Sequence, residues 1–126
     1  MDVFSYIHST TVIVSNQAVA LDFYVNALGW DKAFDQSMGE DRFLTVVPPG
    51  ATTQLVLAPS HWLGSNRTLG GETGITLVCD DVDETYETLS QRGVKFKEPP
   101  ADMPWGQRAV WFYDPDGNEF FLVSGE

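Results

Sequence analysis

The chain has 126 residues, 43% hydrophobic and 13% aromatic, which is sufficient for one folded domain with its own core. Seven basic and 18 acidic residues give a formal net charge of −11, which repels phosphate backbones and anionic lipid. We therefore expect neither nucleic acid nor a membrane as a partner. Cys79 is the single cysteine, and no basic stretch followed by an apolar run stands at the N-terminus, so we expect a cytoplasmic protein without an internal disulfide.

The first half predicts a strand, a helix and three further strands. Residues 6–14 are rich in β-branched side chains, and Ser15 or Asn16 can cap a helix. Apolar residues then recur at helical spacing until Gly29, which ends that helix. The later strands are predicted at residues 30–36, 42–47 and 52–58.

The second half repeats this order after a stretch without periodicity. Residues 60–73 are rich in Gly, Ser and Asn, which predicts a linker or a lid. Asp81 and Glu84 form a capping-box pattern, and Gly93 stops the helix that they open. Strands are predicted at residues 74–79, 94–97, 107–113 and 118–123, with a Pro-rich loop at 99–104. The sequence therefore predicts an α+β fold with two βαβββ modules, at about residues 4–59 and 74–125.

The last two strands are joined by a clear turn signal. Asp114-Pro115-Asp116-Gly117 fixes φ at proline and supplies a residue that tolerates positive φ at glycine. Apolar segments enter and leave this turn, so residues 109–123 are predicted to form a hairpin.

Four segments in this order carry a resemblance to a known family. They are ALDFYVNALGW at residues 20–30, DDVD at 80–83 with Gly93-Val94 after it, WGQR at 105–108 and FYDPDGN at 112–118. The chain thus resembles the glyoxalase / bleomycin-resistance / extradiol-dioxygenase superfamily, also called vicinal oxygen chelate proteins, over essentially its whole length. The resemblance implies modules whose sheets curl around a shared cavity, often within a dimer, so we expect a homodimer.

The resemblance also implies where a metal would be held. Family enzymes place His, Glu or Gln on the first and last strands of each module, where a divalent metal chelates substrate oxygens. Counted from the local motifs, those positions hold Ser9, Gln54, Gly74 and Phe121. Such a set does not make a metal site, because three or four His, Cys, Asp or Glu groups are needed. We therefore predict no metal and no other cofactor.

An alternative keeps a divalent metal in a displaced site. His8 lies one residue before Ser9, on the opposite face of a regular strand, and a one-residue bulge would bring it to the site. Glu119 or Gln54 would then complete the site of a lyase, isomerase or dioxygenase.

His8 and Glu119 are also the candidates for acid–base catalysis. A His–Glu pair could transfer protons on an enolisable carbonyl compound, whereas His8 could equally be a surface histidine. Whether the two side chains meet is left open, and so is the question of whether the protein is an enzyme.

Several aromatic residues are candidates for an apolar binding surface. Strand alternation puts Phe121 and Glu119 on the cavity side and Phe120 towards the helices. The alternative for the aromatic residues is that they only fill the core. Arg108 could hold an anionic ligand group or pair with a surface acid. The predicted ligand-binding residues are Ser9, Gln54, Trp62, Trp105, Arg108, Trp111 and Phe121.

The preferred interpretation is a metal-free protein that binds a small apolar or aromatic ligand. The antibiotic-sequestering proteins of the superfamily are the model for this interpretation, and the acidic surface would suit a cationic drug. The metal content of the purified protein separates this interpretation from the metal-dependent alternative.

Overall fold

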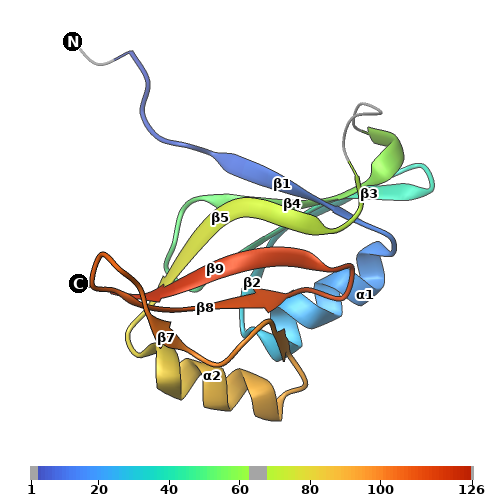
Figure 1. Ribbon diagram of the computed structural model, residues 1–126. Coiled ribbons are helices and arrows are strands. Elements are labelled where there is room, and N and C mark those ends of the chain that lie inside the picture. The colour runs from blue at the N-terminus through green and yellow to red at the C-terminus, as the bar shows by residue number, and fades with distance from the viewer. Residues whose placement is uncertain (1–2, 63–67, 126) are drawn as a thin grey trace. The chain divides into compact units, whose positions relative to one another are not determined.

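Two sheets, each with a helical segment against one face, make up the part of the chain that the computed structural model describes, residues 3–62 and 68–125 (Figure 1). These residues divide between Thr68 and Leu69 into two compact units. The predicted α+β class is confirmed. The strand order is β1-β4-β3-β2 in the first unit and β5-β9-β8-β6 in the second, where β7 also pairs with β8.

The elements of the first unit follow the predicted order. They are β1 (Ser9–Val14), α1 (Gln17–Asp22), the π-helix η1 (Phe23–Ala27), β2 (Asp31–Met38), β3 (Asp41–Val47), β4 (Gln54–Pro59) and the 3-10 turn η2 (Ser60–Trp62). Strand β1 begins at Ser9, later than the predicted residue 6, and lies parallel to β4 with Ser9 opposite Gln54.

The predicted helix is present, but its second half is wider than an α-helix. The Asn16 side chain accepts a hydrogen bond from the Val19 amide, as expected of an N-cap. The amide of Leu28 donates to the carbonyl of Phe23, five residues back, at 3.0 Å, which is the π-helical pattern. Gly29 then adopts a φ of 79° and ends the helix as predicted.

Gln17 joins the start of α1 to two strands of the first sheet. Its Nε2 donates to the carbonyl oxygens of Arg42 at 2.7 Å and Leu57 at 2.8 Å, and its Oε1 accepts from the Arg42 amide at 3.0 Å. Strands β3 and β4 pair at two positions, Thr45 with Val56 and Val46 with Leu55. The Gln17 amide therefore supplies hydrogen bonds to both strands beyond their paired stretch.

The elements of the second unit include one strand, β7, that was not predicted. They are β5 (Gly71–Cys79), α2 (Val82–Gln91), β6 (Lys95–Phe96), β7 (Ala101–Asp102), β8 (Arg108–Tyr113) and β9 (Asn118–Ser124). Strand β5 begins within the predicted linker, and β7 lies within the predicted Pro-rich loop. Asp81 caps α2 by accepting from the Glu84 amide at 3.1 Å, as its sequence pattern indicates.

A row of aromatic rings connects α2 with the sheet of the second unit. The ring of Tyr86 lies 4.6 Å from that of Phe96, Phe96 lies 6.2 Å from Phe112, and Phe112 stacks on Phe120 at 5.3 Å. Helix α2 therefore covers the sheet face that carries Phe112 and Phe120 (Figure 1). Because side chains alternate along a strand, the neighbouring residues of β8 and β9 lie on the other face.

The described helices are short. In the residues that the structure describes, none of them is long and apolar enough to cross a bilayer.

Candidate ligand-binding site

Three aromatic side chains gather on the face of the second sheet that lies opposite α2. Trp111 and Phe121 are register partners on β8 and β9, and their ring centroids are 4.5 Å apart. Trp105, in the loop before β8, lies 6.3 Å from Phe121 in an edge-on arrangement. Trp105 is 62% exposed, while Trp111 and Phe121 are half-buried. We call these three residues the aromatic cluster; a flat molecule could stack on it.

A buried carboxylate adjoins the aromatic cluster. The Glu119 side chain, two residues before Phe121 on the same face of β9, is only 9% exposed. The Lys97 Nζ lies 3.9 Å from Glu119 Oε1 and 5.9 Å from the centroid of the Trp111 ring. Glu119 and Lys97 thus form an ion pair at the edge of the aromatic cluster, next to the Trp111 ring.

The strand next to Glu119 contains a bulge. Glu72 pairs with Glu119 and Thr76 with Phe121, so four steps along β5 match two along β9. The Thr73 hydroxyl donates to the Glu119 carbonyl at 2.8 Å and accepts from an amide two residues on. The residue opposite Phe121 is therefore Thr76, and Gly74 lies within the bulge. Gly74 itself has a φ of 74°, and a Cβ there would meet nothing within 4 Å.

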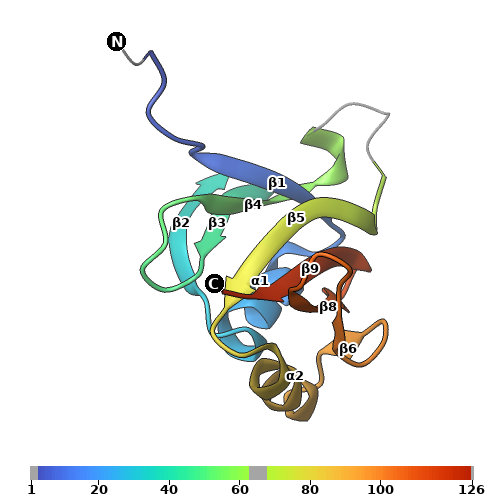
Figure 2. The same ribbon diagram turned by 60° about the vertical axis from the view of Figure 1, so that its left-hand side comes forward.

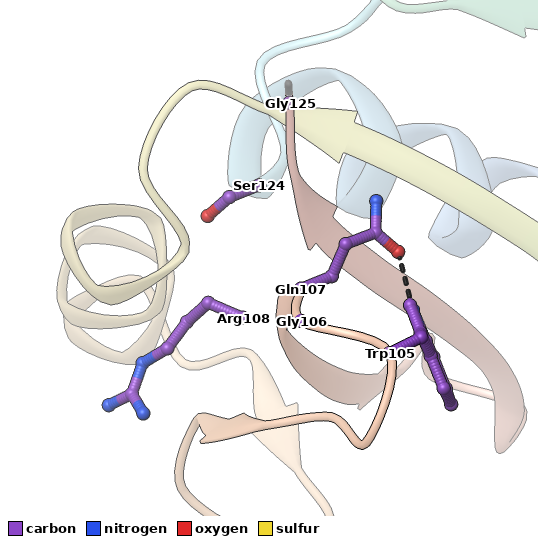
Figure 3. A pocket seen from close by; sticks show the side chains of 6 residues that line it. All are labelled: Trp105, Gly106, Gln107, Arg108, Ser124 and Gly125. Atoms are coloured by element: carbon purple, nitrogen blue, oxygen red, sulfur yellow. Dashed lines mark hydrogen bonds between the residues drawn. The ribbon is translucent and has the colours of Figure 1, made fainter.

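A pocket of about 510 Å³ lies at one end of β8 and β9 (Figure 3). This volume is within the usual range of small-molecule sites, roughly 300–1,000 Å³. Trp105 belongs both to the pocket and to the aromatic cluster, and its Nε1 donates to Gln107 Oε1 at 2.8 Å. The lining residues are Trp105, Gly106, Gln107, Arg108, Ser124 and Gly125.

Arg108 is held by acidic side chains at the edge of this pocket. In Figure 3 its guanidinium points away from Trp105. Its Nη2 and Nε donate to the two carboxylate oxygens of Asp83 at 3.0 and 3.1 Å, and its Nη1 lies 3.4 Å from Asp102. The hydrogen bonds to Arg108 lower the pKa of Asp83, and the same bonds raise the pKa of Arg108. This geometry favours the predicted alternative in which Arg108 pairs with surface acids.

The predicted polar residues of the first unit lie on neighbouring strands. Ser9 is opposite Gln54 in the register of β1 and β4, and the Thr45 hydroxyl donates to Gln54 Oε1 at 2.7 Å. Thr45 is fully buried, so this bond fixes the direction of the Gln54 amide. The structure thus brings Ser9 and Gln54 together at one edge of the first sheet.

Trp62 belongs to a second aromatic group, in the first unit. Its ring stacks on Phe43 at 6.3 Å, and Phe43 lies 5.7 Å from Phe34. Asp41 Oδ2 accepts from Trp62 Nε1 at 3.1 Å and lies 2.6 Å from His61 Nε2. The start of the predicted linker is therefore an ordered turn that fixes the indole.

The two acid–base candidates lie in different units. His8 is exposed and comes directly before β1, where its carbonyl accepts from the Gln54 amide at 2.9 Å. Glu119 lies on β9 with Lys97 as its partner. A functional His8–Glu119 pair stays a prediction.

The side chains at the positions where the resemblance implies metal ligands do not fit a divalent metal. Ser9 offers a neutral hydroxyl, Gln54 an amide oxygen that already accepts a hydrogen bond, and Phe121 no donor atom. Across residues 3–62 and 68–125, no group of three His, Cys, Asp or Glu side chains is placed to hold a metal ion. The donor chemistry here lacks the anionic and imidazole ligands that such ions require.

Three residues that contribute to these sites were not predicted from the sequence. Lys97 directly follows the short strand β6, whose last residue, Phe96, faces α2. Because side chains alternate along a strand, this order could have indicated that Lys97 lies on the other face of the sheet. Phe34 and Phe43 lie on β2 and β3, and their contact depends on the strand register, which the sequence did not specify.

Comparisons with known proteins place this architecture in a family. Residues 6–122 match the family model of the Glyoxalase/Bleomycin resistance protein/Dioxygenase superfamily. A crystal structure of a superfamily member from Sphaerobacter thermophilus DSM 20745 is 58% identical, with a TM-score of 0.91 over 97% of this chain and 98% of the other. TnmS3, an antibiotic binding protein from Streptomyces sp. CB03234, is 36% identical, with a TM-score of 0.87 over 100% of both chains. YetH of Bacillus subtilis (strain 168), described as uncharacterized, is 37% identical over 92% of this chain and 95% of its own.

Proposed function

Because the chain belongs to the Glyoxalase/Bleomycin resistance protein/Dioxygenase superfamily, we propose that it binds a flat, largely apolar or aromatic small molecule without metal chemistry. The observation that carries this proposal is the aromatic cluster of Trp105, Trp111 and Phe121 on the face opposite α2. The likeness to an antibiotic binding protein, at 36% identity over the whole of both chains, supports an antibiotic-like ligand.

The cluster provides the physical basis for such binding. Two rings in direct contact present a rigid apolar surface, and Trp105 adds a third ring that can close against a planar molecule. Aromatic side chains lose little conformational entropy on binding and gain both apolar burial and favourable ring geometry. Phe121, at a position where family enzymes hold a metal, supports binding by stacking rather than by chelation.

Truncation of Trp111 tests the proposed function. The neutral tricyclic compound acridone is a suitable probe because it offers a flat aromatic face without a charge. We expect the wild-type protein to bind it with a Kd below about 1 mM, equivalent to ~4 kcal/mol. Trp111→Ala should weaken binding about tenfold, or ~1.4 kcal/mol, because one face of the stack is removed. Isothermal titration calorimetry measures both values.

A substitution on the opposite face of the same sheet serves as the control. Phe96→Leu changes a ring that lies between Tyr86 and Phe112, so it should leave acridone affinity within about twofold. An equal loss of affinity in both variants would show that binding does not depend on the aromatic cluster. Absence of acridone binding by the wild-type protein would remove the support for stacking.

Metal content distinguishes the proposal from a metal-dependent lyase, isomerase or dioxygenase. Elemental analysis of protein purified without chelator should find well under one metal ion per chain. One ion retained per chain, with a catalytic activity that chelation abolishes, would favour the metal-dependent alternative and a displaced site at His8. The donor set at Ser9, Gln54 and Phe121 supports the first outcome.

The segment before β1 supports the expected homodimer. Residues 3–8 lead away from the first sheet in both views (Figure 1 and Figure 2). The apolar residues of this segment are strongly exposed: Val3 is 83% exposed, Phe4 91%, Tyr6 68% and Ile7 71%. Apolar side chains grouped in this way are covered in most proteins, and we propose that a second copy of the chain covers them.

Replacement of two of these side chains tests the homodimer. The double substitution Phe4→Ser with Ile7→Ser should weaken dimerisation at least about tenfold, since it removes two apolar anchors. Light scattering coupled to size-exclusion chromatography reports the mass, against 14.0 kDa for one chain. Val19→Thr, which changes an apolar side chain that is 53% exposed on α1, should leave the mass unchanged. A monomeric wild-type protein would contradict the proposal.

A further inference from the structure

Glu119 is an acidic side chain in an unusually enclosed place for a protein with a net charge of −11. It lies on the central strand pair of the second sheet, with Tyr113 opposite on β8 and Glu72 opposite on β5. A buried carboxylate needs a cationic or hydrogen-bonding partner, because burial disfavours the charged form. In this structure the cation is the Lys97 ammonium.

The ion pair between Glu119 and Lys97 is long and lies partly in solvent. Their 3.9 Å separation is at the long end of an ion pair, and the Lys97 side chain is 48% exposed. The long, flexible stem of lysine lets its ammonium move into solvent, where hydration compensates for the lost contact. Glu119, at 9% exposure, has no such freedom. The pair is therefore asymmetric: the carboxylate stays in place and the cation can leave.

The position of the Lys97 ammonium also indicates which chemical group of a ligand could bind here. Lys97 Nζ lies 5.9 Å from the centroid of the Trp111 ring, the arrangement in which a cation is attracted by the face of an indole. The same Trp111 ring contacts Phe121, where the proposed ligand stacks. A planar molecule on these rings that carries a positive group could thus place that group where Lys97 Nζ now lies.

The neighbouring strand β5 bulges directly after Glu72, the register partner of Glu119. The bulge in β5 between Glu72 and Thr76 contains Gly74, where an added Cβ would contact nothing within 4 Å. The Glu119 backbone is meanwhile fixed by the Thr73 hydroxyl at 2.8 Å. The carboxylate therefore projects from a rigid backbone beside a strand that carries no side chain at Gly74.

We propose that Glu119, Lys97 and Trp111 form a specificity site for a planar aromatic ligand with an ammonium or amidinium-type group, whose positive charge displaces the Lys97 ammonium. This inference rests on the proposed function and specifies the chemical class of its ligand. Lys97 takes the place of the ligand cation and compensates the negative charge of Glu119 while no ligand is bound. Neutral aromatic molecules would bind without displacing it and would gain nothing from Glu119.

A matched pair of probes tests the displacement. Proflavine is a cationic tricyclic molecule, and acridone is a neutral molecule with the same ring framework. Lys97→Met keeps most of the stem and removes the competing charge, so proflavine affinity should rise about fivefold. Glu119→Gln removes the attracting charge, so proflavine affinity should fall about tenfold. Acridone affinity should change by less than about twofold in both variants, since the rings are intact.

Two further variants test whether the effect comes from net charge alone and whether it depends on the cation at position 97. Lys95→Met makes the same change in net charge two residues away and should alter proflavine affinity by less than about twofold. Lys97→Arg keeps the charge and stacks more strongly on an indole, so it should weaken proflavine binding. This variant also provides a test if Lys97→Met does not fold. Thermal unfolding measured beside the calorimetry verifies that each variant is folded.

The outcomes separate this inference from the proposed function. If acridone binds and depends on Trp111, but the ratio of proflavine to acridone affinity is the same in wild type, Lys97→Met and Glu119→Gln, the displacement is wrong and the aromatic site stands. If neither probe binds any folded variant, the proposed function itself fails. Opposite shifts of the ratio in Lys97→Met and Glu119→Gln support the displacement.

Discussion

Replacing Phe112 by alanine is expected to lower the free energy of unfolding by about 3–5 kcal/mol. The side chain is 2% exposed and lies in the centre of the ring row that joins α2 to its sheet, between Phe96 and Phe120. Truncation removes the apolar burial of a whole ring and leaves a cavity between a helix and a sheet, which neighbouring rings fill only in part. Urea unfolding followed by circular dichroism measures the change.

A substitution of an exposed apolar residue is the appropriate control for Phe112. Val78 is 69% exposed on β5 of the same unit, so Val78→Ala should alter stability by no more than about 0.5 kcal/mol. Losses of similar size in the two variants would mean that the ring row does not form the core of the second unit. Phe112→Leu should fall between the two, since it restores part of the lost volume.

Asp114→Ala is expected to destabilise the protein by about 2–4 kcal/mol, the second largest effect. Asp114 is 5% exposed at the start of the β8–β9 turn, and its Oδ1 accepts from the amides of Asp116 and Asn118, both at 2.9 Å. Its Oδ2 accepts from the Asn118 side chain at 2.8 Å. Alanine would leave these donors without their acceptor, and Asn118 is itself 4% exposed, so water cannot fully replace the carboxylate.

Asp114→Asn separates the backbone bonds from the side-chain bond. Asparagine keeps an oxygen for the two amides and presents an NH₂ group to the NH₂ group of Asn118, so we expect roughly half the loss seen with alanine. Asp80→Ala, at an exposed position of the same unit, should change stability by less than about 0.5 kcal/mol. Equal stability of the wild type and Asp114→Ala in urea unfolding would contradict the role given to the carboxylate.

Local signals in the sequence were sufficient for most of the fold. Caps at Asn16 and Asp81 and stops at Gly29 and Gly93 fixed the helix limits, because these residues act through hydrogen bonds and backbone angles of their own neighbourhood. The α+β class and the repeated element order followed from them.

Two strand features that the sequence did not indicate, the early start of β5 and the whole of β7, depend on partners far along the chain. Strand β5 begins at Gly71, where glycine has low strand propensity, because its register partner on β9 supplies the ladder. Strand β7 has two residues and exists through its pairing with β8. The π-helix η1 needs a shift of hydrogen bonds by one residue, which no helical periodicity reveals.

The placement of the candidate residues in the structure was predicted in part. Strand alternation correctly separated Phe121 from the α2-facing Phe120, and the contact of Trp111 with Phe121 follows from the hairpin. Lys97 was missed because its approach to Glu119 joins two segments that are not adjacent in the sheet order. The partner of Arg108 was not predicted, since many acids were available and only the tertiary structure selects Asp83.

The Gln17 side chain makes the opening motions of α1 and of the first sheet interdependent. One primary amide replaces rungs of the ladder between β3 and β4 while its own backbone belongs to the first turn of the helix. The ends of helices normally fray first and independently. Here the helix start cannot unwind without releasing the carbonyls of Arg42 and Leu57, and those strands cannot separate further without pulling on the helix. The terminus and the strand edge, two sites of low local stability in most folds, therefore protect each other as one cooperative unit.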